Sequence, residues 1–230
     1  MKYGTLSLAA MLGITSCAAP GRRAAEERVI RPSEVTDFRV LYGQNCSGCH
    51  GADGQGALTV GIGSPVYLAI ADDATIRRVV EEGRPGTAMQ PFAQKAGGML
   101  TEAQIDVLVH GIRARWAKPA AFGSDKPPAY AASQPGDAER GKNIFAAVCS
   151  ACHGPDGRGA RTIADSSYLA LVTDQHLRTV TITGMPRLGM PDWRRHDKPL
   201  SDADVTDVVA WLAAQRTPLS TQLNHAGGSE

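Results

Sequence analysis

The pentapeptide Cys46-Ser47-Gly48-Cys49-His50 constrains this chain more than any other part of its sequence. Two thiols three residues apart, followed directly by an imidazole, fit the two vinyl groups and the iron of one haem, and this is the haem c attachment signal. Each thiol can form a thioether with a vinyl group, and the histidine then lies beneath the iron as its proximal ligand. A second copy stands at Cys149-Ser150-Ala151-Cys152-His153. The residues predicted to hold two haems c are the cysteines Cys46, Cys49, Cys149 and Cys152 and the iron ligands His50 and His153.

A Cys-x-x-Cys pair has two other common uses. A redox disulfide of the thioredoxin type would lie in a βαβ context and would not need a histidine next to the second cysteine. A tetrahedral zinc site would need two such pairs close together. The two motifs here are separated by 103 positions, so the haem interpretation is favoured.

The composition is that of a soluble globular protein, with 43% hydrophobic and 20% charged residues in 230. Aromatic residues make up only 5%. Small domains with few large rings have little apolar area to bury, so a haem in each would supply much of the core, and folding is expected to depend on it. The formal net charge of +1 and the lack of Lys/Arg blocks argue against nucleic acid as a partner.

The N-terminus predicts export. Residues 1–16 carry Lys2 and then an apolar run too short to span a bilayer, which indicates a secretory signal peptide. The segment Ile14-Thr15-Ser16-Cys17 resembles the lipobox of bacterial lipoproteins, in which the cysteine receives lipid and becomes the first mature residue. Residues 17–35 would then be a lipidated tether at the outer, periplasmic or extracytoplasmic face of a bacterial membrane. Ordinary cleavage near Ala18, which leaves a soluble protein, is the alternative.

An internal repeat divides the rest of the chain. The spacing is 103 positions for Cys46 and Cys149, 101 for Tyr67 and Tyr168, 101 for Met89 and Met190, and 100 for Ile105 and Val205. Two homologous domains are therefore predicted. Their expected ranges are 36–117 and 136–217, joined by a Pro-rich, semi-stiff linker at 118–135 and followed by a disordered tail at 218–230.

Each domain is expected to be all-helical. Apolar residues at helical spacing, including Val35 and Phe38, lead into Cys46, and a second short helix begins near Asp73 and ends at Gly83. A capping box at Thr101–Gln104, repeated at Ser201–Asp204, predicts the start of the last helix of each domain. The faces expected to be buried are Ile105, Leu108, Val109 and Ile112 in the first domain and Val205, Val208, Val209 and Leu212 in the second.

A haem iron that only passes electrons needs a second axial ligand, because an open position would bind oxygen, peroxide or carbon monoxide. Met89 and Met190 occupy the same place in two Gly/Pro-rich loops that align without a gap, and we predict that they are these ligands. Met185 and Met99 are the rivals, but their counterparts in the repeat, Arg84 and Pro199, carry no thioether. The histidines that fit surface or helix positions better than ligation are His110, His176, His196 and His225.

With both halves considered, the chain resembles tandem c-type cytochrome domains, as in dihaem cytochromes c and the c subunits of some terminal oxidases and dehydrogenases. The features that carry this resemblance are the two Cys-x-x-Cys-His motifs, the turns after them, the methionine loops and the terminal helices. In that family the first and last helices cross at a small residue and an aromatic, matched in the second domain by Gly141 and Phe145. Two departures lie in the first domain, where Phe38 replaces the glycine and Gln90 separates Met89 from Pro91.

The resemblance implies a dihaem electron carrier rather than an enzyme. Its expected partners are a quinol-oxidising complex or dehydrogenase on one side and a terminal oxidase or small carrier cytochrome on the other. A docking patch at Arg194-Arg195-His196 is a further possibility, with a solvated charge cluster as the simpler interpretation. Two alternatives remain: a cytochrome subunit of a larger membrane redox complex, and a dihaem peroxidase, which would need a vacant distal position and a general acid/base.

Overall fold

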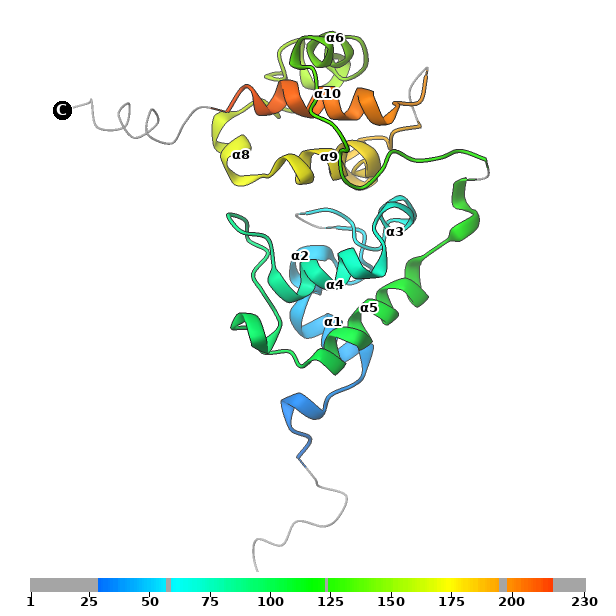
Figure 1. The fold of residues 1–230 in the computed structure, drawn as a ribbon, viewed down its shortest axis with the longest axis vertical. Coiled ribbons are helices and arrows are strands. Elements are labelled where there is room, and N and C mark those ends of the chain that lie inside the picture. The colour runs from blue at the N-terminus through cyan, green and yellow to red at the C-terminus, as the bar shows by residue number, and fades with distance from the viewer. Residues whose placement is uncertain (1–28, 57–58, 123, 195–197, 217–230) are drawn as a thin grey trace, which may run out of the picture. The chain divides into compact units, whose positions relative to one another are not determined.

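The computed structural model describes residues 29–56, 59–122, 124–194 and 198–216 (Figure 1). Its contacts divide the chain into two units, residues 1–34 and 35–230. The described part of the first unit holds one 3₁₀ turn, Pro32–Glu34, in which the Arg31 backbone N–H donates to the Glu34 carboxylate at 3.1 Å. The predicted signal peptide, the lipidated Cys17 and the C-terminal tail lie outside the described residues.

The described part of the second unit contains helices and no strand, which confirms the expected all-α class. We call residues 36–117 the first lobe and residues 136–217 the second lobe. The first lobe contains α1 (Phe38–Asn45), α2 (Ser47–His50), α3 (Pro65–Ile70), α4 (Asp73–Glu82) and α5 (Glu102–Trp116). The second lobe contains α6 (Ala138–Val148), α7 (Ser150–His153), α8 (Ser166–Leu171), α9 (Asp174–Thr183) and α10 (Asp202–Ala213). Short 3₁₀ turns lie at Gln94–Ala96, Pro119–Phe122 and Pro186–Leu188.

Local capping fixes where the long helices begin. Both predicted capping boxes are confirmed: Thr101 and Gln104 cap α5 reciprocally, and Ser201 and Asp204 do the same for α10. The α1 helix begins later than predicted. Asp37 is its N-cap and accepts from the Val40 backbone N–H at 2.9 Å, so Val35 precedes the helix. Residue 35 nevertheless packs against the core of the first lobe.

The last helix of each lobe forms the centre of its core. All eight residues predicted for the buried faces of α5 and α10 are at most 7% exposed. In the second lobe α10 lies between α6 and α9 (Figure 1). The apolar faces of α5 and α10 are therefore the surfaces against which the other helices of each lobe pack.

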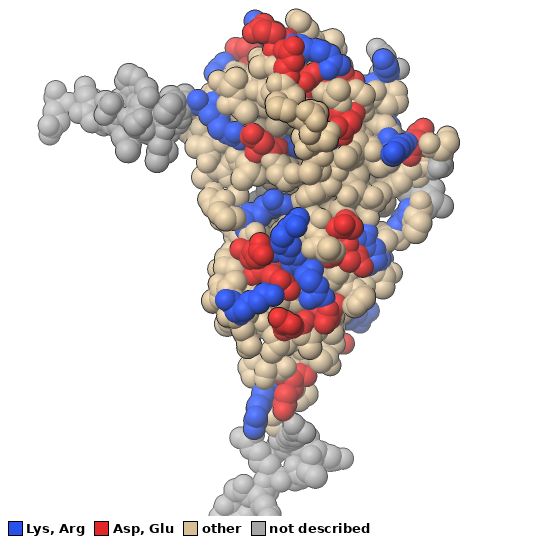
Figure 2. All heavy atoms as spheres, in the orientation of Figure 1, with Lys and Arg blue, Asp and Glu red and all other residues tan. Residues whose placement is uncertain are grey.

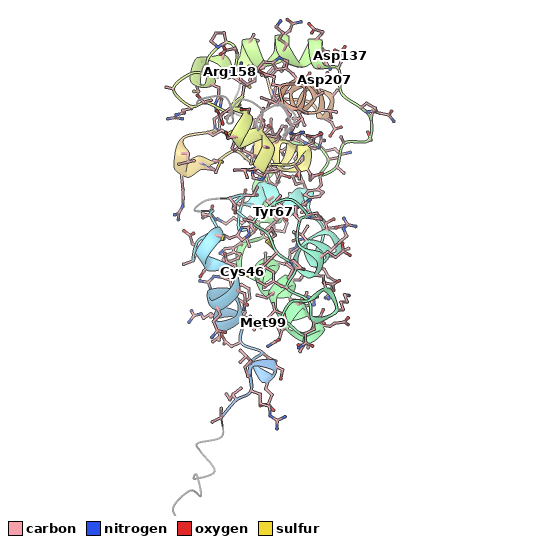
Figure 3. The ribbon with its side chains drawn as sticks, turned by 90° about the vertical axis from the view of Figure 1, so that its left-hand side faces the viewer. Cys46, Tyr67, Met99, Asp137, Arg158 and Asp207 are labelled. Carbon is pink, nitrogen blue, oxygen red and sulfur yellow. The ribbon has the colours of Figure 1, made fainter. Side chains whose placement is uncertain are left out.

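The crossing of α6 and α10 confirms the expected roles of Gly141 and Phe145. A Cβ atom at position 141 would overlap the backbone carbonyl of Asp207, so only glycine allows this approach. Phe145 is fully buried, and its ring centroid lies 4.3 Å from that of Trp211. The Asp137 backbone N–H also donates to the Asp207 carboxylate at 2.7 Å, and Figure 3 labels both residues at this crossing.

In the first lobe the crossing is built with the residue sizes exchanged. Phe38 of α1 faces Gly111 of α5, and a Cβ atom at 111 would overlap the base of the Phe38 ring. The counterparts of this pair in the second lobe are Gly141 and Trp211. The replacement of glycine by Phe38 is therefore compensated on the opposite helix.

Among the described residues of the linker, one short helical element is found. This is the 3₁₀ turn Pro119–Phe122, which agrees with the expectation that its prolines prevent a regular helix. Across the described residues, none of the helices combines the length and the apolar character that crossing a membrane requires.

Candidate functional site

Each Cys-x-x-Cys-His motif folds as a helical turn that follows a longer helix. Cys46 ends α1 and begins α2, and its carbonyl accepts from the His50 backbone N–H at 3.0 Å. The second motif repeats this arrangement, with 3.0 Å between the His153 backbone N and the Cys149 carbonyl. Because residues three and four apart share one face of a helical turn, each motif presents its two thiols and its imidazole together.

The four motif cysteines are free thiols in the structure. In each pair the first cysteine is half-buried and the second is exposed. Burial, followed by the nearby thiol of Cys49, raises the pKa of Cys46 to about 12, and burial with Cys152 raises the pKa of Cys149 to about 11. The first thiol of each motif is therefore protonated at neutral pH.

Hydrogen bonds orient both motif histidines. His50 Nδ1 lies 3.1 Å from the Val60 carbonyl oxygen, and His153 Nδ1 lies 2.6 Å from the Arg161 carbonyl oxygen. A carbonyl can only accept, so Nδ1 is the donor in both residues, and Nε2 is the ring nitrogen left available to a metal. Neutral imidazole with a free Nε2 is the form that binds a metal, and the hydrogen bond from Nδ1 fixes the ring. The residues present therefore fit a haem iron.

The surroundings of His50 reinforce this state. Its Nδ1 also lies 3.0 Å from the Thr59 hydroxyl, which can share the Nδ1 proton as a second acceptor. Burial lowers the pKa of His50, and the hydrogen bond with Val60 opposes that shift. The imidazole of the first motif is therefore held neutral, as ligation requires.

The two predicted methionine loops close in the same way. Gly83 and Gly184 each end a helix with a φ angle of 67°, where a side chain is strained. A Cβ at either position would also collide with the backbone around the methionine of its own loop. In the first loop the Arg84 N–H donates to the Met89 carbonyl at 2.7 Å, and in the second the Met185 N–H donates to the Met190 carbonyl at 3.0 Å.

This shared construction gives Met89 and Met190 equivalent places, and both side chains are half-buried. The extra Gln90 before Pro91 leaves the closing hydrogen bond of the first loop in place. The rival Met99 is 79% exposed (Figure 3). Met185 is half-buried and pairs with Met190 through the backbone. The assignment of Met89 and Met190 as axial ligands stays a prediction.

The other histidines lie apart from the motifs in the chain. His110 is an exposed residue of α5, and His176 is half-buried on α9. The pKa of His176 is lowered by burial first and then by the charge of Arg84. His196 and His225 lie outside the described residues, as does Arg195 of the possible docking patch. The remaining member, Arg194, is paired with Asp192 at 2.8 Å.

Sequence reasoning missed the groups that support the motifs. The acceptors at Val60 and Arg161 are backbone atoms, so no side-chain pattern marks them. Their positions differ by 101, the spacing of the repeat, and this was the only available signal. Tyr42 was also missed: its hydroxyl donates to the Gly51 carbonyl at 2.8 Å, directly after the first motif. Its counterpart Phe145 has no hydroxyl, so the two sites differ here.

Comparison with known proteins places the chain in a family. Residues 33–112 and 136–212 match the family model described as cytochrome C oxidase, cbb3-type, subunit III. A cbb3-type cytochrome c oxidase subunit CcoP from Azospirillum sp. (strain B510) is 28% identical over 200 residues, covering 76% of this chain and 60% of that protein. The subunit FixP of a cbb3-type cytochrome c oxidase from Sinorhizobium medicae is 29% identical and covers 72% of this chain and 61% of that protein.

A second group of relatives is named for a different complex. The cytochrome bc1 complex cytochrome c subunit of Corynebacterium diphtheriae is 23% identical over 228 residues, covering 93% of this chain and 78% of that protein. The chain thus spans only about 60% of the length of the oxidase subunits that it matches. Since the family model covers both motif-bearing segments, the expected resemblance is confirmed. The chain belongs to the family of the cbb3-type cytochrome c oxidase subunit III and is a c-type cytochrome with two cytochrome c domains in tandem.

Proposed function

We propose that this chain carries electrons between respiratory redox proteins through two haems c, each with one histidine and one methionine ligand. The observation that carries the proposal is the repeated site construction. Both lobes hold a histidine with its Nδ1 bonded to a backbone carbonyl, and both hold a methionine in a loop closed by the same backbone hydrogen bond. Haem c, when bound, supplies a one-electron iron couple.

The chain's own residues have three tasks in this function. The cysteines Cys46 and Cys49, and Cys149 and Cys152, hold the two groups covalently. His50 and His153 supply nitrogen ligands, and thioether sulfur from Met89 and Met190 favours the reduced state and raises the potential. If each iron took both a histidine and a methionine, no position would be left for oxygen or peroxide, so electron carriage is favoured over peroxidase-type catalysis.

The relatives support a place between respiratory complexes. Some are named as subunits of cbb3-type oxidases and others as subunits of the bc1 complex. We therefore propose a quinol-oxidising complex or dehydrogenase as the electron donor and a terminal oxidase or small carrier cytochrome as the acceptor. A permanent subunit of such a complex is the second candidate, favoured by the names of these same relatives.

The distribution of surface charge does not indicate a strongly acidic or a strongly basic partner. On the face that Figure 2 shows, Lys/Arg and Asp/Glu side chains are interspersed among the described residues, without a large area of one sign. Mixed charges of this kind do not produce strong electrostatic steering. Export and anchoring through lipid on Cys17 would instead keep the protein near its partners in the membrane.

The ligand assignment can be tested with the near-infrared charge-transfer band from methionine to ferric iron. We expect the band of the wild type to correspond to two methionine-ligated haems per chain. Met89→Ala should lose the contribution of one haem, and Met190→Ala that of the other. Met99→Ala and Met185→Ala are matched controls and should keep both. The reduced wild type should not bind carbon monoxide, and binding would favour the enzyme interpretation instead.

A further inference from the structure

A buried arginine ties the linker to the second lobe. Arg178 of α9 is only 3% exposed. Its guanidinium donates to the Ala129 carbonyl at 2.8 Å, to the Tyr130 carbonyl at 3.2 Å and to the Thr206 hydroxyl at 2.8 Å, and it also pairs with Asp202. The Asp202 carboxylate in turn accepts from the Ala129 backbone N–H at 2.9 Å. A buried cation is tolerated only when its donors are satisfied, and here the linker supplies two of the acceptors.

The equivalent residue of the first lobe shows that this burial is not a general property of the fold. Arg77 stands at the matching position of α4, 101 residues earlier. Its side chain is 33% exposed and pairs with Glu81 and Asp106 of its own lobe. Only the second-lobe arginine is directed onto the linker backbone.

Tyr130 connects the same point of the linker to the first lobe. Its carbonyl accepts from Gln175 Nε2 of α9 at 2.7 Å. Its ring packs against the core of the first lobe, 6.5 Å from the Tyr67 ring in an edge-on arrangement, and its hydroxyl bonds to Arg84. One residue therefore has its backbone fixed to the second lobe and its ring fixed to the first.

Additional contacts join the lobes away from Tyr130. Arg187, in the methionine loop of the second lobe, pairs with Asp53, which follows the haem motif of the first. A single hydrophobic cluster also contains residues from both sides. Its members from the first lobe and linker are Val66, Ile70 and Phe122, and those from the second lobe include Ile182, Trp193 and Leu200.

We propose that Arg178 and Tyr130 are positioning residues for electron transfer between the two lobes, because they make the linker a clamp that holds the lobes in one arrangement. This inference rests on the proposed function, since it requires one haem in each lobe. The rate of electron tunnelling falls steeply with distance, so a fixed arrangement gives one rate where a free tether would give a broad range. The prolines of the linker limit its own flexibility, and the clamp removes what remains.

The test uses the complete dihaem protein and two measurements. Pulsed EPR between the two ferric haems reports the distribution of distances, and fast reduction followed optically reports the rate of transfer between them. We expect one narrow distance peak and one rate constant for the wild type. Arg178→Gln should broaden the distance peak, slow the mean transfer and spread the rates, while the methionine charge-transfer bands stay unchanged.

Matched variants separate the clamp from general loss of structure. Arg77→Gln removes the equivalent arginine and should leave the distance peak and the rate as in the wild type. Tyr130→Ala removes only a partly buried ring and should broaden the peak even if Arg178→Gln does not fold. Tyr130→Phe keeps the ring and should retain the narrow peak.

Two results would overturn the clamp: a broad distance distribution in the wild type, or an unchanged narrow peak and rate in Tyr130→Ala and in any folded Arg178→Gln. Neither affects the proposed function, provided that both haems retain their methionine bands. A wild type without two such haems would instead contradict the proposed function itself.

Discussion

Phe38 and Gly111 form a large-and-small pair across the helix crossing of the first lobe, and the residues at the matching sequence positions of the second lobe, Gly141 and Trp211, have the reverse sizes. In both lobes one helix must present a glycine so that the other can approach. In the first lobe the glycine faces an aromatic ring, whereas in the second it faces the backbone of α10 at Asp207. The two lobes should therefore differ in how much an added methyl group at Gly111 or at Gly141 destabilises them.

For the first lobe we predict that Gly111→Ala lowers the free energy of unfolding by about 1–3 kcal/mol, the usual effect of an added methylene in a packed interior. The new methyl group would overlap the Cγ and Cδ2 atoms of the half-buried Phe38 ring, so the ring or α1 must shift. Gly43→Ala is the control, because position 43 of α1 has no neighbour within 4 Å and alanine favours a helix. Denaturant unfolding of the haem-loaded protein would measure both, and equal stability of the two variants would contradict the account.

For the second lobe we predict a larger loss in Gly141→Ala. Here the obstacle is the Asp207 carbonyl, a backbone atom that no rotamer change can remove. The two helices must separate, which also weakens the packing of Phe145 against Trp211. Thermal unfolding followed through the methionine band should show the second haem site lost at a lower temperature than the first. Loss of both sites together at the wild-type temperature would count against this prediction.

The capping box of α10 predicts a pH dependence. Burial would raise the pKa of Asp204, but hydrogen bonds from Ser201 and the charges of Arg140 and Lys198 outweigh it, and the pKa lies below its usual value. A carboxyl with a lowered folded-state pKa stabilises the fold above its unfolded pKa of about 4, and this stabilisation is lost as the pH falls through the folded value.

Asp204→Asn should therefore reduce the free energy of unfolding by about 0.5–1 kcal/mol at pH 7, since the asparagine keeps a capping oxygen but loses the charge. The gap between variant and wild type should shrink below about pH 4. Denaturant unfolding at a series of pH values would measure this difference in unfolding free energy. A difference that stays constant down to about pH 3 would show that the charge of Asp204 is not responsible.

Cys17 is the predicted site of membrane attachment. We expect Cys17→Ser to move the exported protein from the membrane fraction to the soluble fraction, because no other lipid site is predicted. Fractionation followed by haem staining would show the change. A variant that stays in the membrane fraction would rule out Cys17 as the sole anchor, and would favour association with a larger complex.

The features that could be read from the sequence are local ones. Capping boxes, haem motifs and the buried faces of α5 and α10 depend on residues within one or two helical turns, so spacing alone predicted them. The burial of Arg178 could not be predicted, because it depends on acceptors from a linker some fifty positions earlier in the chain. The reversed sizes of Phe38 and Gly111 relative to Gly141 and Trp211 can be found in the repeat, but only when the first and last helices of the two lobes are aligned together.

The central claim, two covalently attached haems per chain, is tested most directly by the intact mass of the exported protein together with its haem content. The account predicts two haem increments in the wild type, one increment when Cys46 and Cys49 are both changed to serine, and one when Cys149 and Cys152 are changed. A wild-type mass with one increment or none would contradict it.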